Sequence, residues 1–276
     1  MKGKIIDFHT HAFPDKVAGK VVEQLASHYK LPVTYSGELE ELLDYAKRDG
    51  VAKIVLHAAA TKASQVQTNN DWISGVICEE IVGFGSLHPE FVEVEAELER
   101  MMDLGLTGIK FHPEFQGVDL LDSRMWKIYE AIGDRFPVMF HVGDAHSQLS
   151  APHKLAKILD AFPNMTVIGA HLGGFAAWAE SERYIIGREL YVDTSSAVWL
   201  MSPQEATRLI RQHGVHKVLF GTDYPICTAQ EELDRLDKLD LTHEEKEMIL
   251  WKNAEELLAR FPRNRQTVQV NPVASI

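Results

Sequence analysis

Short apolar runs rich in β-branched residues alternate along the chain with longer segments in which apolar residues recur at helical spacing. Eight of these runs predict β-strands, and helical segments lie between them. The strands are expected at residues 4–11, 52–58, 81–89, 106–113, 137–143, 165–174, 189–196 and 216–225. Each parallel strand needs a crossover, and crossovers are mostly helical, so eight β/α units predict an α/β protein built as a closed (β/α)8 barrel of the TIM type.

A doubly wound open sheet is the alternative architecture. It usually has fewer strands, and its dinucleotide-binding form has a GxGxxG turn after the first strand. This chain has DFHTHAF at residues 7–13 instead, which favours the barrel. Two helices, expected at residues 15–29 and 38–50, lie between the first two strands and form a helical insertion.

The end of the chain predicts one more helix, over residues 242–261. Thr242 and Glu245 have the spacing of a capping box at its start, and an amphipathic pattern follows. A short tail at residues 263–276 has weak periodicity and is consistent with an arm of a homodimer. The 276 residues are expected to form a single barrel domain, residues 1–276.

Charge and composition exclude several classes of partner. The formal net charge is −12 and no cluster of Lys and Arg offsets it, so nucleic acid and anionic membranes are not expected partners. No long apolar run or signal peptide is visible, which predicts a soluble protein of the cytoplasm. The two cysteines, Cys78 and Cys227, are far apart and lack metal-binding spacing.

Histidines gather at the carboxyl ends of the predicted strands. Seven of the 13 occupy such positions, and Asp223 ends the eighth strand. These histidines are His9, His11, His57, His88, His112, His141 and His171. In a parallel barrel all these ends open on one face, where catalytic groups gather. A core-filling role would instead favour Val, Ile and Leu, although His57 and His88 are equally consistent with capping the strands.

The first pair of histidines has the geometry of a metal site. Side chains alternate along a strand, so His9 and His11 share a face with Cα atoms about 6.6 Å apart. Together with His141 and Asp223 they offer the nitrogen and oxygen ligands that a divalent ion prefers. Asp7 lies on the face of His9 and is expected either to orient an imidazole or to form a buried ion pair.

Several motifs resemble the amidohydrolase superfamily. They are DFHTH, FHVG, GAHLGG, FGTDYP and WKNAEELLARF, which occur in the family's order between Ile5 and Phe261. The resemblance is to the amidohydrolase-related branch of metal-dependent TIM-barrel enzymes, which includes aminocarboxymuconate semialdehyde decarboxylase, resorcylate decarboxylase and several lactone hydrolases. It implies that His9, His11, His141 and Asp223 bind one divalent ion, expected to be zinc, and that His171 is catalytic, holding or deprotonating a water molecule.

Lys110 and His112 have two interpretations. Because they share a strand face, they are expected to bind an anionic group of the substrate. In binuclear relatives a carbamylated lysine of strand four bridges two ions. The alternative interpretation is therefore that Lys110 is carbamylated and binds a second ion.

The expected activity is hydrolysis of a small carboxylated amide, ester or lactone by a metal-activated water, with Asp223 as proton acceptor. The alternative is non-oxidative decarboxylation of a small unsaturated or aromatic acid, because the same ligands serve both reactions. A metal-dependent nuclease also begins with HxH, but it would have an acidic residue at the end of strand four. A non-catalytic barrel that serves only for binding or as a scaffold is a further alternative, but it would not explain why potential metal ligands gather on one rim of the barrel.

Overall fold

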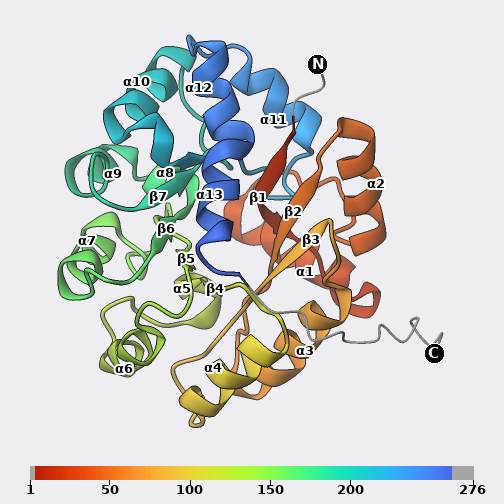
Figure 1. Cartoon of the computed structure of the whole chain (residues 1–276), viewed down its shortest axis with the longest axis vertical. Helices are drawn as coiled ribbons and strands as arrows, with labels where there is room; N and C mark the ends of the chain where they lie inside the picture. The colour runs from red at the N-terminus through yellow and green to blue at the C-terminus, as the bar shows by residue number, and fades with distance from the viewer. Residues whose placement is uncertain (1–3, 263–276) are drawn as a thin grey trace.

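The computed structural model describes residues 4–262, which form a parallel eight-stranded barrel (Figure 1). The strands are β1 (Ile6–His11), β2 (Lys53–His57), β3 (Ile81–Gly85), β4 (Gly108–Phe111), β5 (Val138–Phe140), β6 (Val167–Gly169), β7 (Tyr191–Asp193) and β8 (Val218–Leu219). Each strand pairs in parallel with the next along the chain. The predicted (β/α)8 fold is confirmed.

Backbone hydrogen bonds between β1 and the segment after β8 close the barrel. The amide of Phe8 donates to the Phe220 carbonyl at 2.8 Å, and the amide of His11 donates to the Tyr224 carbonyl at 2.8 Å. Between them, the amide of Asp223 donates to the His9 carbonyl at 2.7 Å. The segment after β8 is therefore fastened directly beside the histidines of β1.

Helices surround the strands, as crossovers between parallel strands require (Figure 1). The α-helices are α1 (Asp15–Tyr29), α2 (Leu39–Asp49), α3 (Val66–Val76), α4 (Val94–Asp103), α5 (Pro113–Gln116), α6 (Ser123–Ile132), α7 (Pro152–Ala161), α8 (Ala170–Gly173), α9 (Trp178–Tyr184), α10 (Pro203–His213) and α11 (Ala229–Leu236). Helices α1 and α2 form the predicted insertion after the first strand. Within residues 4–262, no helix combines the length and apolar character needed to cross a bilayer.

The C-terminal segment covers one end of the barrel. It comprises α12 (His243–Glu247), the π-helical η3 (Met248–Lys252) and α13 (Asn253–Ala259), with the predicted capping box at its start. The predicted single α-helix is thus interrupted by a π segment, in which the Ile249 carbonyl accepts a hydrogen bond from the Phe220 amide at 3.0 Å. Side chains of α13 pack on the barrel interior in a cluster of Ile6, Phe8, Val55, Phe84, Met139, Ile168, Leu219, Ala254, Leu257 and Phe261. The predicted tail, residues 263–276, lies outside the described residues.

Most strands are shorter than the sequence predicts, and this changes the setting of two site residues. Strand β6 ends at Gly169, so His171 lies in the short helical turn α8. Strand β8 ends at Leu219, so Asp223 lies in the following loop. Both residues have left-handed backbone conformations, with φ of +63° at His171 and +61° at Asp223. Their apolar neighbours continue the strand pattern in sequence, but these backbone conformations are incompatible with a strand.

Candidate metal centre

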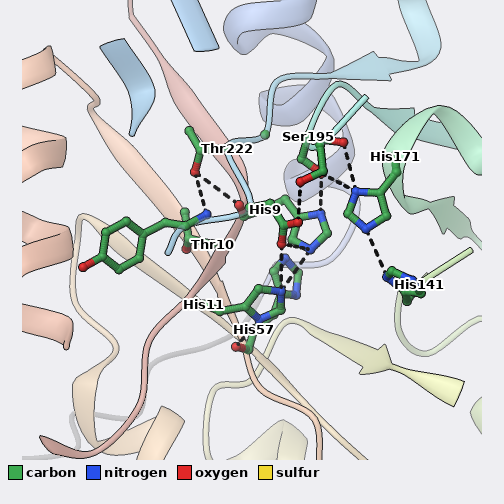
Figure 2. A network of polar contacts seen from close by, with 12 residues as sticks. His9, Thr10, His11, His57, His141, His171, Ser195 and Thr222 are labelled. Carbon is green, nitrogen blue, oxygen red and sulfur yellow. Dashed lines mark hydrogen bonds and ion pairs between the residues drawn. The ribbon is translucent and has the colours of Figure 1, made fainter. Parts of the chain in front are cut away.

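Three of the four predicted metal ligands meet at the barrel mouth. His9 Nε2 lies 3.1 Å from His11 Nε2, and each of these nitrogens is 3.5 Å from Asp223 Oδ1. The three ligand atoms lie within 4.8 Å of one another. Figure 2 shows the two imidazoles pointing toward each other from β1. Gly221 makes room for this arrangement, because a Cβ there would lie 2.8 Å from the Cβ of His9.

The fourth predicted ligand, His141, faces His171 across the same mouth. His141 Nδ1 lies 3.0 Å from His171 Nε2, the contact drawn in Figure 2. Both side chains are buried, as is that of His9. A non-glycine residue in the left-handed region costs on the order of 1–3 kcal/mol, and such strain clusters at functional sites. The backbone at His171 and Asp223 therefore carries strain that places their side chains in this mouth.

Each of the four imidazoles is held by its outer nitrogen. The contacts are His9 Nδ1 to Asp193 Oδ2 (2.9 Å), His11 Nδ1 to the His57 carbonyl (3.0 Å), His141 Nε2 to the Gly143 carbonyl (2.9 Å) and His171 Nδ1 to the Ser195 carbonyl (2.9 Å). A carbonyl or carboxylate oxygen can only accept, so in each ring the outer nitrogen carries the proton. The inner nitrogen is then left with its lone pair.

Burial keeps these rings neutral. Loss of solvent lowers the pKa of His11 to about 3 and that of His171 to about 4. It also holds the pKa values of His9 and His141 well below the usual range, with Lys110 and neighbouring imidazoles adding to the effect. Two pairs of inner nitrogens therefore face each other at 3.1 and 3.0 Å with no proton between them. Facing lone pairs repel, and a cation bound among these nitrogens offsets the repulsion, so the donor set fits a divalent ion.

Lys110 also faces this centre. Its Nζ lies 3.0 Å from His9 Nε2 and its side chain is fully buried on β4. Burial lowers the pKa of Lys110 to about 8, although the carboxylates of Asp223 and Asp193 raise it. His112, its predicted partner in substrate binding, instead contacts the Tyr29 hydroxyl through Nε2 at 2.9 Å. The two side chains thus have different neighbours in the structure.

Asp193, at the end of β7, supports the centre and was missed by the sequence reasoning. Besides His9, it accepts hydrogen bonds from the His171 amide at 3.1 Å, the Ser195 amide at 3.0 Å and the Ser195 hydroxyl. Ser195 Oγ in turn lies 2.9 Å from His9 Nδ1 and 3.0 Å from His171 Nδ1. The signal was present, because Asp193 lies near the carboxyl end of a predicted strand, as the histidines do.

Asp7 does not have either of the roles expected from the sequence. Its carboxylate accepts hydrogen bonds from the Thr222 hydroxyl at 2.7 Å, the Thr222 amide at 3.1 Å and the backbone amide of His9 at 3.2 Å. Burial raises the pKa of Asp7 to about 7. Asp7 therefore holds the backbone of β1 against the loop after β8, while Asp193 orients the ring of His9.

A second group of ligand atoms lies beside the first. His112, Glu114 and His141 each place a potential ligand atom within 4.8 Å of the other two. The rings of His112 and His141, however, are stacked at 4.0 Å with an angle of 11° between their planes. An imidazole binds a metal in the plane of its ring, so parallel stacked rings are a poor pair for one ion. His112 and His141 are therefore poorly placed to share a second ion.

The barrel and its nitrogen-rich mouth define a metal-dependent (β/α)8 enzyme. The profile of the amidohydrolase family matches residues 6–260, and the chain belongs to that family. The family assignment and the ligand groups together support a divalent metal at this site. The resemblance seen in the sequence is thereby confirmed.

One curated relative and two solved structures extend this finding. The decarboxylase orsB of Emericella nidulans is 25% identical over 174 residues, which cover 60% of this chain and 46% of the relative. The chain thus spans about half the length of that relative.

The 5-carboxyvanillate decarboxylase LigW2 of Novosphingobium aromaticivorans, solved with bound manganese, is similar with a TM-score of 0.70 and 16% identity, over 93% of this chain and 97% of that one. A probable 2-pyrone-4,6-dicarboxylic acid hydrolase of Acinetobacter baumannii is similar with a TM-score of 0.65 and 15% identity, over 93% of this chain and 99% of that one. At these identities the two structures show a shared fold.

Proposed function

We propose that this protein is a metal-dependent hydrolase of a small carboxylated amide, ester or lactone. The observation that carries the proposal is the convergence of unprotonated imidazole nitrogens and the Asp223 carboxylate at the mouth of the barrel. The family's description as amidohydrolase and the pyrone hydrolase among its structural neighbours support hydrolysis as the reaction.

The proposed ligands of the ion are His9, His11, His141 and Asp223. Three imidazoles and one carboxylate favour zinc over manganese, because manganese prefers sites rich in oxygen. LigW2 contains manganese, so elemental analysis of the purified protein for zinc and manganese tests this choice. A bound divalent ion supplies Lewis acidity, which acidifies a water molecule and polarises a substrate oxygen.

His171 is the proposed residue that holds or moves a proton beside the ion. Its Nδ1 donates to the Ser195 carbonyl, so Nε2 is the atom that can accept a proton from water. Asp223 is the proposed second proton carrier. Its Oδ2 accepts from the Ser196 hydroxyl at 2.7 Å, which leaves Oδ1 facing the histidines. Burial raises the pKa of Asp223 to about 6, although the hydrogen bond from Ser196 lowers it.

Decarboxylation of a small unsaturated or aromatic acid is the second candidate. It is favoured by the similarity to the decarboxylase orsB and by the rings that lie together at the barrel mouth. Tyr29 packs edge-on against Phe175 and Phe115, with ring centroids 5.2 and 6.0 Å apart. Such rings suit a planar substrate. In this reaction His171 would deliver a proton to the ring carbon that loses carbon dioxide.

Isotope labelling separates the two reactions. The zinc-loaded protein is incubated in H₂¹⁸O with lactones, esters, amides and unsaturated carboxylic acids, and the products are analysed by mass spectrometry. Hydrolysis predicts one ¹⁸O atom in the organic product from at least one lactone, ester or amide. Release of carbon dioxide with solvent hydrogen on the product carbon, and no label in the organic product, would contradict hydrolysis and establish the decarboxylase.

A further inference from the structure

Helix α1 reaches the barrel mouth although little of it is buried. Of its 15 residues only Ala18 is buried, so apolar packing alone gives the helix little reason to lie where it does. The helix ends at Tyr29, because Lys30 adopts the left-handed conformation with φ of +56°. Its last two residues, His28 and Tyr29, both contact the loops that follow barrel strands.

Each of these residues has a defined polar partner at the mouth. His28 Nε2 lies 2.7 Å from Asp144 Oδ2, in the loop after β5. The Tyr29 hydroxyl lies 2.9 Å from His112 Nε2 and 3.4 Å from His141 Nε2. The insertion therefore brings a phenol hydroxyl next to one of the proposed ligands of the ion.

The surroundings of His112 determine which way the Tyr29 hydrogen bond runs. Among residues 4–262, neither His112 Nδ1 nor Glu114 Oε2 has a hydrogen-bond partner, and the two atoms face each other at 3.7 Å. Of the two ring nitrogens beside the Tyr29 hydroxyl, His141 Nε2 donates its proton to the Gly143 carbonyl, so His112 Nε2 is the one that can accept the hydrogen of Tyr29.

A tyrosine oxygen that donates its hydrogen in this way keeps its lone pairs for another group. We propose that Tyr29 is a specificity-determining residue, whose oxygen accepts a hydrogen bond from a hydroxyl of the bound substrate. The inference rests on the proposed function, since it places the substrate at the barrel mouth beside Tyr29 and the metal centre. The hydrogen bond between His28 and Asp144 holds the tip of α1 in the position that makes this contact.

The test compares ligands that differ only by a hydroxyl. Binding of benzoate and of the three monohydroxybenzoates to the zinc-loaded full-length protein is measured by calorimetry. The wild type is expected to bind at least one hydroxybenzoate roughly 3- to 10-fold more tightly than benzoate, the range of one net hydrogen bond. Tyr29→Phe is expected to abolish this preference and to leave the affinity for benzoate and the zinc content unchanged.

Tyr35→Phe is the matched control. Tyr35 is in the same insertion, but its hydroxyl bonds Glu231 at 2.9 Å, so this variant should keep the wild-type preference. The proposal is overturned if the wild type binds neither type of acid or shows no preference, or if Tyr29→Phe retains the preference. A Tyr29-dependent preference in a protein that incorporates no ¹⁸O would uphold this inference while refuting the proposed hydrolase.

Discussion

Replacing Asp193 by Asn tests whether the outer hydrogen bonds prepare the histidines for metal. Asn keeps the shape of Asp but presents one oxygen and one amino group. The three donors on the Oδ1 side, the His171 amide and the Ser195 amide and hydroxyl, attract the remaining oxygen. The amino group is then turned toward His9 Nδ1, which can bond to it only as an acceptor. The substitution therefore favours the His9 tautomer whose proton sits on Nε2, inside the metal site.

The expected magnitude follows from the contacts of His9. Loss of a carboxylate that orients a ligating imidazole typically lowers metal affinity by about 10- to 100-fold. Ser195 Oγ, 2.9 Å from His9 Nδ1, remains as a weaker acceptor for the original tautomer, which limits the loss to this range. That range corresponds to about 1.4–2.7 kcal/mol of binding free energy. Stability without metal should change little, because the shape and most hydrogen bonds are kept.

Competition with a chromophoric chelator measures zinc affinity, and thermal unfolding in chelator checks the fold. Asp144→Asn is the matched control, because Asp144 is also a buried aspartate at the mouth but bonds His28. It should bind zinc more tightly than Asp193→Asn does, because the carboxylate of Asp144 bonds His28 and none of the proposed metal ligands. Wild-type affinity in Asp193→Asn, with the fold intact, would refute the tautomer argument.

Two further substitutions test packing and charge elsewhere. Gly221→Ala places a Cβ 2.8 Å from the His9 Cβ, so urea unfolding should show a loss of about 1–3 kcal/mol and zinc titration a weaker site. Gly19→Ala is the control and should not destabilise the protein, because no atom lies within 4 Å of the added carbon. Equal losses of stability and zinc affinity in the two variants would contradict this reasoning. Burial lowers the pKa of His213 to about 4, and its neutral ring donates to the Leu190 carbonyl and accepts from the Gly187 amide. The unfolded chain binds this proton first, so the stability due to His213 is present above about pH 6.5 and is lost toward pH 4. Relative to His213→Gln, the wild type should lose about 2–3 kcal/mol of unfolding free energy between about pH 7.5 and 4.5. If the unfolding free energies of the two proteins change in parallel with pH, His213 is not the group responsible.

The barrel was predictable because its strands are marked by local sequence pattern. Each strand is a short β-branched run followed by a helical segment, and parallel pairing then leaves few topologies. The ends of the strands were less predictable. The sequence around Asp223 continues the strand pattern, and only the backbone hydrogen bond to His9, more than two hundred residues away, reveals the loop.

The candidate site was predictable where a residue's position in a strand fixes its direction. His9 and His11 were expected to share a face, and their Nε2 atoms lie 3.1 Å apart. Asp193 was missed because its role depends on β7 lying near β1 in the closed barrel, and an aspartate at a strand end is common without such a role. Tyr29 was missed because the position of α1 depends on tertiary contacts of His28 and Tyr29 that no helical pattern encodes.

Zinc content after equilibrium dialysis at a fixed, buffered free-zinc concentration tests the central claim most directly. The wild-type chain should retain about one ion, as four protein ligands to a single site imply. Asp223→Ala, measured beside it, should retain only a small fraction of that amount while remaining folded. A wild-type protein that binds no divalent ion, or a variant that binds as much as the wild type, would contradict the metal centre described here.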